Sequence, residues 1–129
     1  MNYLKLCGAI AHNGQRYDAP FQPDVYPHDR KATSVRKALP LYLIIEALAQ
    51  IGCRSAAEAL HTTARIIPVQ LRNFRMEKEV AQGDGPYRLQ AALKENGRQI
   101  ALDTLLIDSR GNTAVSAELW VSVMAASGA

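Results

Sequence analysis

The stretch PLYLIIEALAQ, residues 40–50, decides the fold of this 129-residue chain. Proline suits the first turn of a helix, and good helix formers without a further proline follow it. The sequence therefore predicts a long helix from Pro40 to about Leu60. The first half of this helix is apolar on nearly every face. A helix of that kind needs cover, so we expect other elements to wrap it.

The chain after this helix predicts long antiparallel strands. Segments 66–82, 87–95, 98–108 and 113–124 are strand-like and are separated by turn signals. The last segment alternates apolar and polar side chains from Val115 to Val123, which is typical of a sheet with one buried face. We expect that face to cover the helix, in a single α+β domain spanning residues 1–129.

The chain before the helix is less regular. An apolar segment from Tyr3 to Ile10 precedes Asn13-Gly14, a dipeptide that favours a two-residue turn between short strands. Residues 18–40 contain four of the six prolines and many charged residues. This composition predicts a surface loop between the hairpin and the helix.

The composition excludes several classes of protein. With 48% hydrophobic and 21% charged residues, the chain is an ordinary globular sequence. The net charge of +3 permits an acidic partner, but no nucleic-acid-binding motif is present. Cys7 and Cys53 have no metal-ligand spacing, so no metal site is expected. The apolar run at 39–52 is too short to span a membrane, and we expect a cytoplasmic protein without a secretory signal.

Glu46 and Gln50 are the candidate functional pair in the helix. Their i, i+4 spacing places both side chains on one face, about one turn apart. A carboxylate in an apolar surround should have a raised pKa, as the general acid or base of an enzyme often does. The alternative is a structural glutamate that bonds to the backbone or to an arginine of a partner chain.

Three stretches of the chain carry a family resemblance. The core Ile45-Glu46-Ala47-x-Ala49-Gln50, together with Asn73-Phe74-Arg75-Met76 and Gln82-Gly83-Asp84, resembles the hotdog-fold (3R)-hydroxyacyl-acyl carrier protein dehydratases of type II fatty acid synthesis. The resemblance implies a long central helix wrapped by a curved antiparallel β-sheet. It also implies a homodimer or a dimer of dimers, with sheets joined edge to edge and active sites at the dimer interface. The substrate would be an acyl thioester on acyl carrier protein or coenzyme A.

The sequence departs from the family at the catalytic histidine. The family places this residue fourteen positions before the helix Glu, where this chain has Ala32. His28 is the nearest substitute, with Asp29 available to orient its ring, and its alternative is an ordinary solvated loop histidine. The resemblance then gives Glu46 and His28 the catalytic roles and Gln50 an orienting role.

The helix start and the preceding loop supply the other candidate residues. Leu41 stands where the family has a glycine, and with Tyr42 it is expected to line the substrate cleft. A basic run flanks the expected mouth of the cleft and would dock an acidic carrier protein, unless it is only a solvated loop. The residues of this run are Arg30, Lys31, Arg36 and Lys37.

Three functions remain open at this point. The first is a dehydratase-like enzyme that uses Glu46 with His28. The second is a hotdog thioesterase, in which Glu46 alone activates water against the thioester carbon. The third is a non-catalytic subunit that binds an acyl carrier protein or pairs with an active homologue. Nothing in the sequence implies a metal or an organic cofactor.

Overall fold

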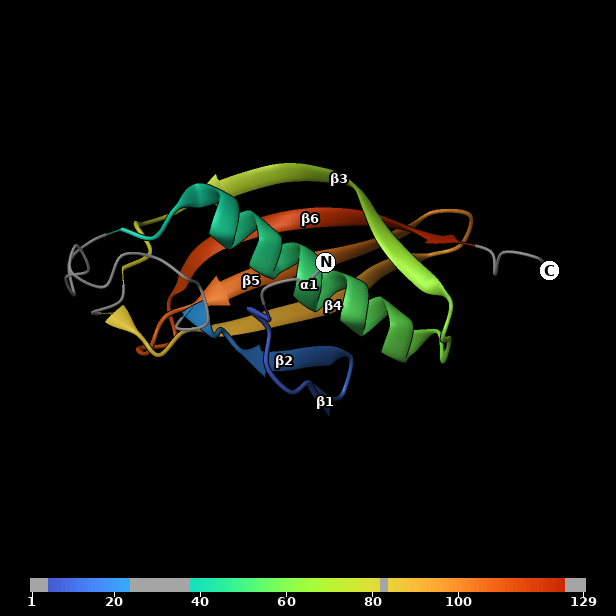
Figure 1. The fold of residues 1–129 in the computed structure, drawn as a ribbon, viewed down its shortest axis with the longest axis horizontal. Coiled ribbons are helices and arrows are strands. Elements are labelled where there is room, and N and C mark those ends of the chain that lie inside the picture. The colour runs from blue at the N-terminus through green and yellow to red at the C-terminus, as the bar shows by residue number, and fades with distance from the viewer. Residues whose placement is uncertain (1–4, 24–37, 82–83, 125–129) are drawn as a thin grey trace.

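The computed structural model describes residues 5–23, 38–81 and 84–124, which form one helix and one antiparallel sheet (Figure 1). The elements are β1 (Ala11–Asn13), β2 (Arg16–Pro20), α1 (Leu41–Ala59), β3 (Arg65–Met76), β4 (Arg88–Asn96), β5 (Ile100–Ile107) and β6 (Thr113–Met124). The six strands are ordered β1-β2-β4-β5-β6-β3, and α1 lies across one face of the sheet. The α+β class expected from the sequence is confirmed.

The helix forms where its sequence predicts it. Pro40 is extended and precedes the first helical residue, and no side chain caps this end. The buried positions recur every three or four residues, which is the pattern of a helix with one face on a core. They are Leu43, Ile44, Ala47, Leu48, Ile51, Gly52, Ser55 and Ala56.

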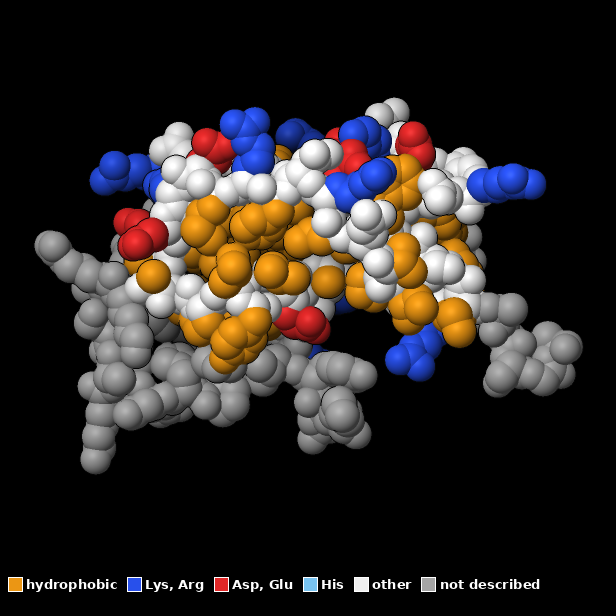
Figure 2. All heavy atoms as spheres, turned by 90° about the horizontal axis from the view of Figure 1, so that it is seen from above, with side chains coloured by type: hydrophobic (Ala, Val, Ile, Leu, Met, Phe, Trp, Pro, Cys, Tyr) orange, Lys and Arg blue, Asp and Glu red, His pale blue; other side chains and the backbone are white. Residues whose placement is uncertain are grey.

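One face of the sheet covers this helix, as expected, and the opposite side of the helix is exposed in the single chain. Tyr42 is 58% exposed at the first turn, and Leu41 and Ile45 are exposed beside it. The reason is geometric, because β3 is the last strand of the sheet and leaves an open edge. Seen from that edge, hydrophobic side chains gather in a band, with charged ones along one rim (Figure 2).

The alternation predicted for the last strand is confirmed in β6. Val115, Ala117, Leu119 and Val121 are buried in the core. On the other face of the strand Glu118 accepts a hydrogen bond from Trp120 Nε1 at 2.7 Å. Glu118 also pairs with Lys94, and this contact is the main reason that its pKa is lowered. The outer face of the sheet is therefore stabilised by a cross-strand ion pair.

Helix and sheet lie very close together at Gly52. A Cβ atom added to this glycine would lie 2.3 Å from Leu119 Cδ2 on β6. Real Cβ atoms do not approach other atoms so closely, so the absence of a side chain permits this helix-to-sheet distance. Gly52 thus sets the distance between α1 and the sheet. That distance in turn fixes the position of the residues on the exposed side of the helix.

Three boundaries differ from the expectation. The first turn is at Gly14-Gln15, one residue later than predicted, and Gly14 adopts the left-handed φ of 65°. The expected loop at 18–40 begins later, because β2 continues to Pro20 and pairs with β4. The strand expected at 66–82 ends at Met76, since the next two backbone N–H groups both donate to the Ala114 carbonyl and leave the ladder.

Candidate active site

Glu46, Gln50 and Arg54 form a polar stripe on the helix face that points away from the sheet. Glu46 is exposed, so the expectation of a carboxylate buried in apolar surroundings is wrong. The reason is that the sheet packs against the opposite side of α1, whose buried positions exclude residues 46, 50 and 54. The i, i+4 spacing of the pair nevertheless brings the two side chains together. Gln50 Nε2 donates a hydrogen bond to Glu46 Oε1 at 3.3 Å.

The orientation of the Gln50 amide is fixed by the start of the chain. Its Oε1 atom accepts hydrogen bonds from the backbone N–H groups of Leu6, at 2.9 Å, and Cys7, at 3.1 Å. Because an amide oxygen must face these two donors, the amide nitrogen is directed toward Glu46. Gln50 therefore occupies one carboxylate oxygen of Glu46 and leaves Oε2 for another hydrogen bond. This role requires a contact 44 residues away, which the local pattern does not contain.

Arg54 holds the same segment of backbone. Its Nη1 atom donates to the Cys7 carbonyl at 2.7 Å and to the Gly8 carbonyl at 2.9 Å. The other side of this segment pairs with the end of β2, where Gly8 N donates to the Pro20 carbonyl at 2.9 Å. The segment is thus held between the sheet and two helix side chains, so it has a fixed position beside Glu46.

An open groove of about 910 Å³ follows the stripe. Its floor includes Glu46, Gln50 and Arg54, one wall is the segment from Lys5 to Ala9, and the other wall is Arg65 to Pro68 of β3. Ala49, Cys53 and the isoleucines of β3 give it an apolar lining between the polar groups. A groove with an apolar lining and few polar groups is the usual form of a small-molecule site.

The two thiols are not candidate nucleophiles. Burial, with a smaller contribution from the charge of Glu46, raises the pKa of Cys53 to about 11. Burial also raises the pKa of Cys7, against the lowering effect of Arg54. A thiol with a raised pKa is poorly ionised at neutral pH, so both cysteines are structural groups.

The structure brings together only some of the residues predicted for the site. Glu46 and Gln50 share the groove, whereas Leu41 and Tyr42 lie at the first turn of α1 and do not line it. Their contact with a substrate stays a prediction. The other candidates lie outside the described residues, so their roles also stay predictions. They are His28, Arg30, Lys31, Arg36 and Lys37.

The two histidines that the structure describes lie away from Glu46. The His12 ring stacks on Tyr17, with 4.4 Å between ring centroids. His61 follows the end of α1, and neither histidine lines the groove. Within the described ranges, Glu46 therefore has a glutamine neighbour and no imidazole neighbour.

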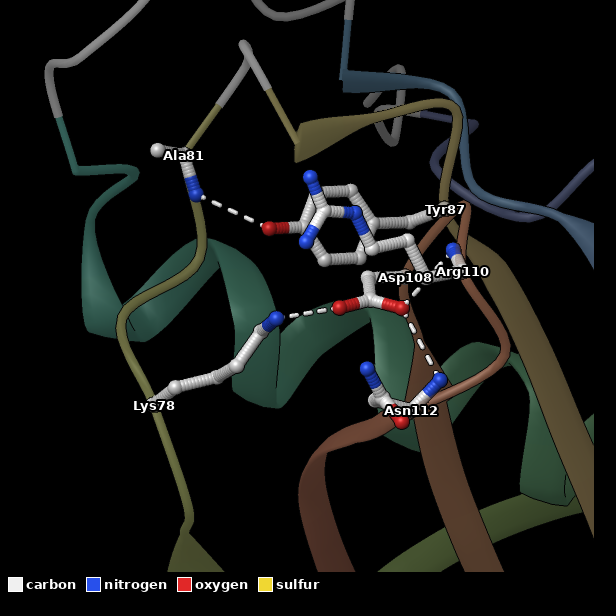
Figure 3. A network of polar contacts seen from close by, with 6 residues as sticks. All are labelled: Lys78, Ala81, Tyr87, Asp108, Arg110 and Asn112. Carbon is white, nitrogen blue, oxygen red and sulfur yellow. Dashed lines mark hydrogen bonds and ion pairs between the residues drawn. The ribbon is translucent and has the colours of Figure 1, made fainter.

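A second polar cluster supports the backbone that leads into α1 (Figure 3). Asp108 is buried, pairs with Lys78, and accepts hydrogen bonds from the N–H groups of Arg110, at 3.0 Å, and Asn112, at 2.9 Å. The Lys78 contact is the largest cause of the lowered pKa of Asp108, followed by the Asn112 N–H group. This cluster was not among the residues predicted from the sequence, although an aspartate that opens a turn is a known signal.

The same cluster fixes the connection between β3 and β4 beside the helix start. The Ala81 N–H group donates to the Tyr87 hydroxyl at 3.1 Å, and Leu39 N donates to the Val80 carbonyl at 2.7 Å. Burial is the main cause of the raised pKa of Tyr87. These contacts position Pro40 and the first turn of α1, so the cluster supports the site without lining it.

The outer sheet face carries a second hollow, of about 430 Å³. Small side chains such as Ala92 and Ser116 form its floor, and Arg16, Lys94 and Glu118 are among its longer lining residues. Lys94 and Glu118 already neutralise one another there. The groove at Glu46 is the stronger site, because it combines an accessible carboxylate with a fixed hydrogen-bond donor.

The described residues contain no cluster of three histidine, cysteine or acidic side chains that could hold a metal ion. In the same part of the chain, no helix is long and apolar enough to cross a bilayer.

Comparison with solved structures identifies the fold. The chain is similar to a thioesterase from Haemophilus influenzae, with a TM-score of 0.69 at 15% identity over 88% of this chain and 75% of that one. It is also similar to a Streptococcus mutans protein bound to acetyl-CoA, with a TM-score of 0.68 at 12% identity over 96% and 93% of the two chains. A Bacillus halodurans protein with CoA gives a TM-score of 0.70 at 12% identity, over 95% and 76%.

These similarities, with one helix on a six-stranded antiparallel sheet, show that the chain has the hotdog fold. Neither a scan against family models nor a search of curated proteins finds a match. The hotdog fold inferred from the resemblance is therefore confirmed, whereas the dehydratase family within it stays a prediction.

Proposed function

We propose that this protein is a hotdog acyl-thioester hydrolase in which Glu46 is the general base. The observation that carries the proposal is the Glu46 carboxylate, exposed in an apolar-lined groove with one oxygen held by Gln50. Structural neighbours that include a thioesterase and proteins bound to CoA or acetyl-CoA support an acyl thioester as the ligand. A hydrolase needs no histidine partner for Glu46, which favours it over the histidine-dependent dehydratase.

The chemistry follows from the two Glu46 oxygens. Gln50 donates to Oε1, and Oε2 accepts the hydrogen bond of a water molecule placed against the thioester carbon. Glu46 takes a proton as the water oxygen bonds to that carbon, and the carbon–sulfur bond then breaks. The leaving thiolate recovers the proton from Glu46, so the products are a carboxylic acid and a free thiol. General-base assistance of this kind contributes about 10²- to 10⁴-fold to the rate.

The proposed active form is a homodimer joined along β3. This strand is a 12-residue edge, and Val69, in its middle part, is 59% exposed. Unpaired strand edges readily pair with another chain, and the exposed Leu41, Tyr42 and Ile45 add apolar surface nearby. A second copy paired antiparallel at this edge would cover the uncovered side of α1 and close the groove at Glu46.

The activity is tested with Glu46→Gln, and Glu58→Gln serves as the matched control. Glu58 is an exposed carboxylate on the same helix that does not line the groove. We incubate each protein with acyl-CoA and with acyl carrier protein, including 3-hydroxyacyl forms, and follow the products by mass spectrometry. We expect release of the acyl group to fall at least a hundredfold in Glu46→Gln and to stay unchanged in Glu58→Gln.

Two results would contradict the proposed hydrolase function. Loss of water from the 3-hydroxyacyl chain without acyl release would make the protein a dehydratase. If no substrate changes, the remaining function is that of a non-catalytic subunit.

The dimer is tested with Val69→Lys, which places a charge on the open edge. In light scattering we expect the wild type to be a dimer and Val69→Lys to be a folded monomer, because charged side chains disfavour edge pairing. Val123→Lys is the control, since Val123 is an exposed apolar residue of β6, which lies inside the sheet. A Val69→Lys protein that remains dimeric at the same concentration contradicts the assignment.

A further inference from the structure

The charges of the groove are unbalanced. Lys5, Arg54 and Arg65 line it, whereas Glu46 is its only lining carboxylate among the described residues. The ion pairs found within residues 5–23, 38–81 and 84–124 involve other side chains, so none of these three cations is neutralised there. A groove with this excess of positive charge attracts an anionic ligand.

Arg54 is prepared to bind such a ligand. A guanidinium carries five N–H donors. Nη1 donates to the Cys7 and Gly8 carbonyls, and the guanidinium also has a side-chain hydrogen bond with Cys7. The remaining donors of the guanidinium are available to bind an anion. The side chain therefore keeps its position without a ligand, which reduces the ordering cost of binding an anion.

The distance from Arg54 to Glu46 indicates which class of anionic ligand would fit the groove. The two residues are eight positions apart on one helix, which is about 12 Å along its axis. In a 4′-phosphopantetheine thioester, about thirteen bonds separate the sulfur from the phosphorus at the other end, which corresponds to about 15 Å for an extended chain. An arm bent slightly would place its sulfur beside Glu46 and its phosphate beside Arg54. The apolar lining at Ala49, Cys53 and Ile66 lies between these two ends.

Resting on the hydrolase function above, we propose that Lys5, Arg54 and Arg65 bind the phosphate of a phosphopantetheine thioester. This phosphate is common to coenzyme A and to a loaded carrier protein. The site therefore recognises the arm that the two carriers share, and it is built from other residues than the basic run at 30–37.

Calorimetry with two probes tests the phosphate site without turnover. The probes are 4′-phosphopantetheine and pantetheine, which differ only by the phosphate. We expect the wild type to bind the phosphorylated probe at least tenfold more tightly. Arg65→Gln and Lys5→Gln should each weaken that binding about three- to tenfold and leave pantetheine unaffected. Arg16→Gln, which removes an exposed cation from the opposite sheet face, should change neither affinity.

Equal affinity for the two probes, no detectable binding of either, or no effect of Arg65→Gln would overturn the site. Coenzyme A and holo carrier protein form the second arm of the experiment. Equal weakening of both by Arg65→Gln supports recognition of the shared phosphate, whereas weakening of coenzyme A alone shows recognition of the nucleotide and overturns it. Phosphate-dependent binding without Glu46-dependent hydrolysis would contradict the proposed hydrolase activity and support the phosphate site. Glu46-dependent hydrolysis at the same rate with and without the phosphate on the substrate would support the hydrolase activity and contradict the phosphate site.

Discussion

Replacement of Gly52 by alanine should destabilise the protein although alanine is the better helix former. In an exposed helix this change would gain about 1 kcal/mol. Here the added Cβ would lie 2.3 Å from Leu119 Cδ2 and 3.5 Å from Thr104 Cγ2. Leu119 is 2% exposed, so its side chain has no free space to move into. Overpacking of a core costs about 1–3 kcal/mol, and with so deep an overlap we expect a net loss of about 1–2 kcal/mol.

The assay is urea unfolding followed by the fluorescence of Trp120, the single tryptophan of the chain. The protein concentration is held constant, because the proposed dimer would contribute to the apparent stability. Gly97→Ala is the control, since no atom lies within 4 Å of its added Cβ, and it should change the unfolding free energy by less than about 0.5 kcal/mol.

A second variant identifies the cause. Leu119→Val removes the atom that the new methyl group meets, so Gly52→Ala should cost at least about 1 kcal/mol less in that background. A Gly52→Ala protein as stable as the wild type would refute the reasoning, because helix propensity would then outweigh the contact. Equal costs of Gly52→Ala in both backgrounds would show that Leu119 is not the obstacle.

Two further predictions concern titrating groups. The pKa of Asp108 is lowered in the folded state, so its contribution to stability is present above its unfolded pKa of about 4 and is lost as the pH falls below that value. In urea unfolding at a series of pH values, Asp108→Asn should therefore lose stability less steeply in acid than the wild type, and equal slopes would contradict this. The pKa of Cys53 is about 11, so iodoacetamide should modify it about a hundredfold more slowly than free cysteine at pH 8. Mass spectrometry of the labelled protein gives the rate, and labelling as fast as free cysteine would show that the thiol is accessible and ionised.

Much of the fold could be predicted because it rests on local patterns. The helix follows from Pro40 and the residues after it, and β6 follows from the alternation between Val115 and Val123. The exposure of Glu46 could not be predicted in the same way. An apolar helix surface can be covered by its own sheet or by another chain, and the two cases have the same sequence pattern.

In the candidate site, too, some features follow from local sequence patterns and others depend on distant contacts. The proximity of Glu46 and Gln50 follows from their spacing on a helix, whereas the direction of the Gln50 amide depends on Leu6 and Cys7. Arg54 likewise acts on backbone that is 46 and 47 residues away. Contacts at such separations depend on the tertiary fold, which is why the N-terminal wall of the groove had no signal in the sequence.

Each end of the segment between residues 23 and 38 is held by its own backbone hydrogen bond to the connection between β3 and β4. On one side Phe21 N donates to the Tyr87 carbonyl at 3.0 Å, and on the other Leu39 N donates to the Val80 carbonyl at 2.7 Å. Insertions, deletions or substitutions between these points therefore need not move α1 or its carboxylate. Sequence changes can therefore accumulate in this segment while Glu46 keeps its place in the groove.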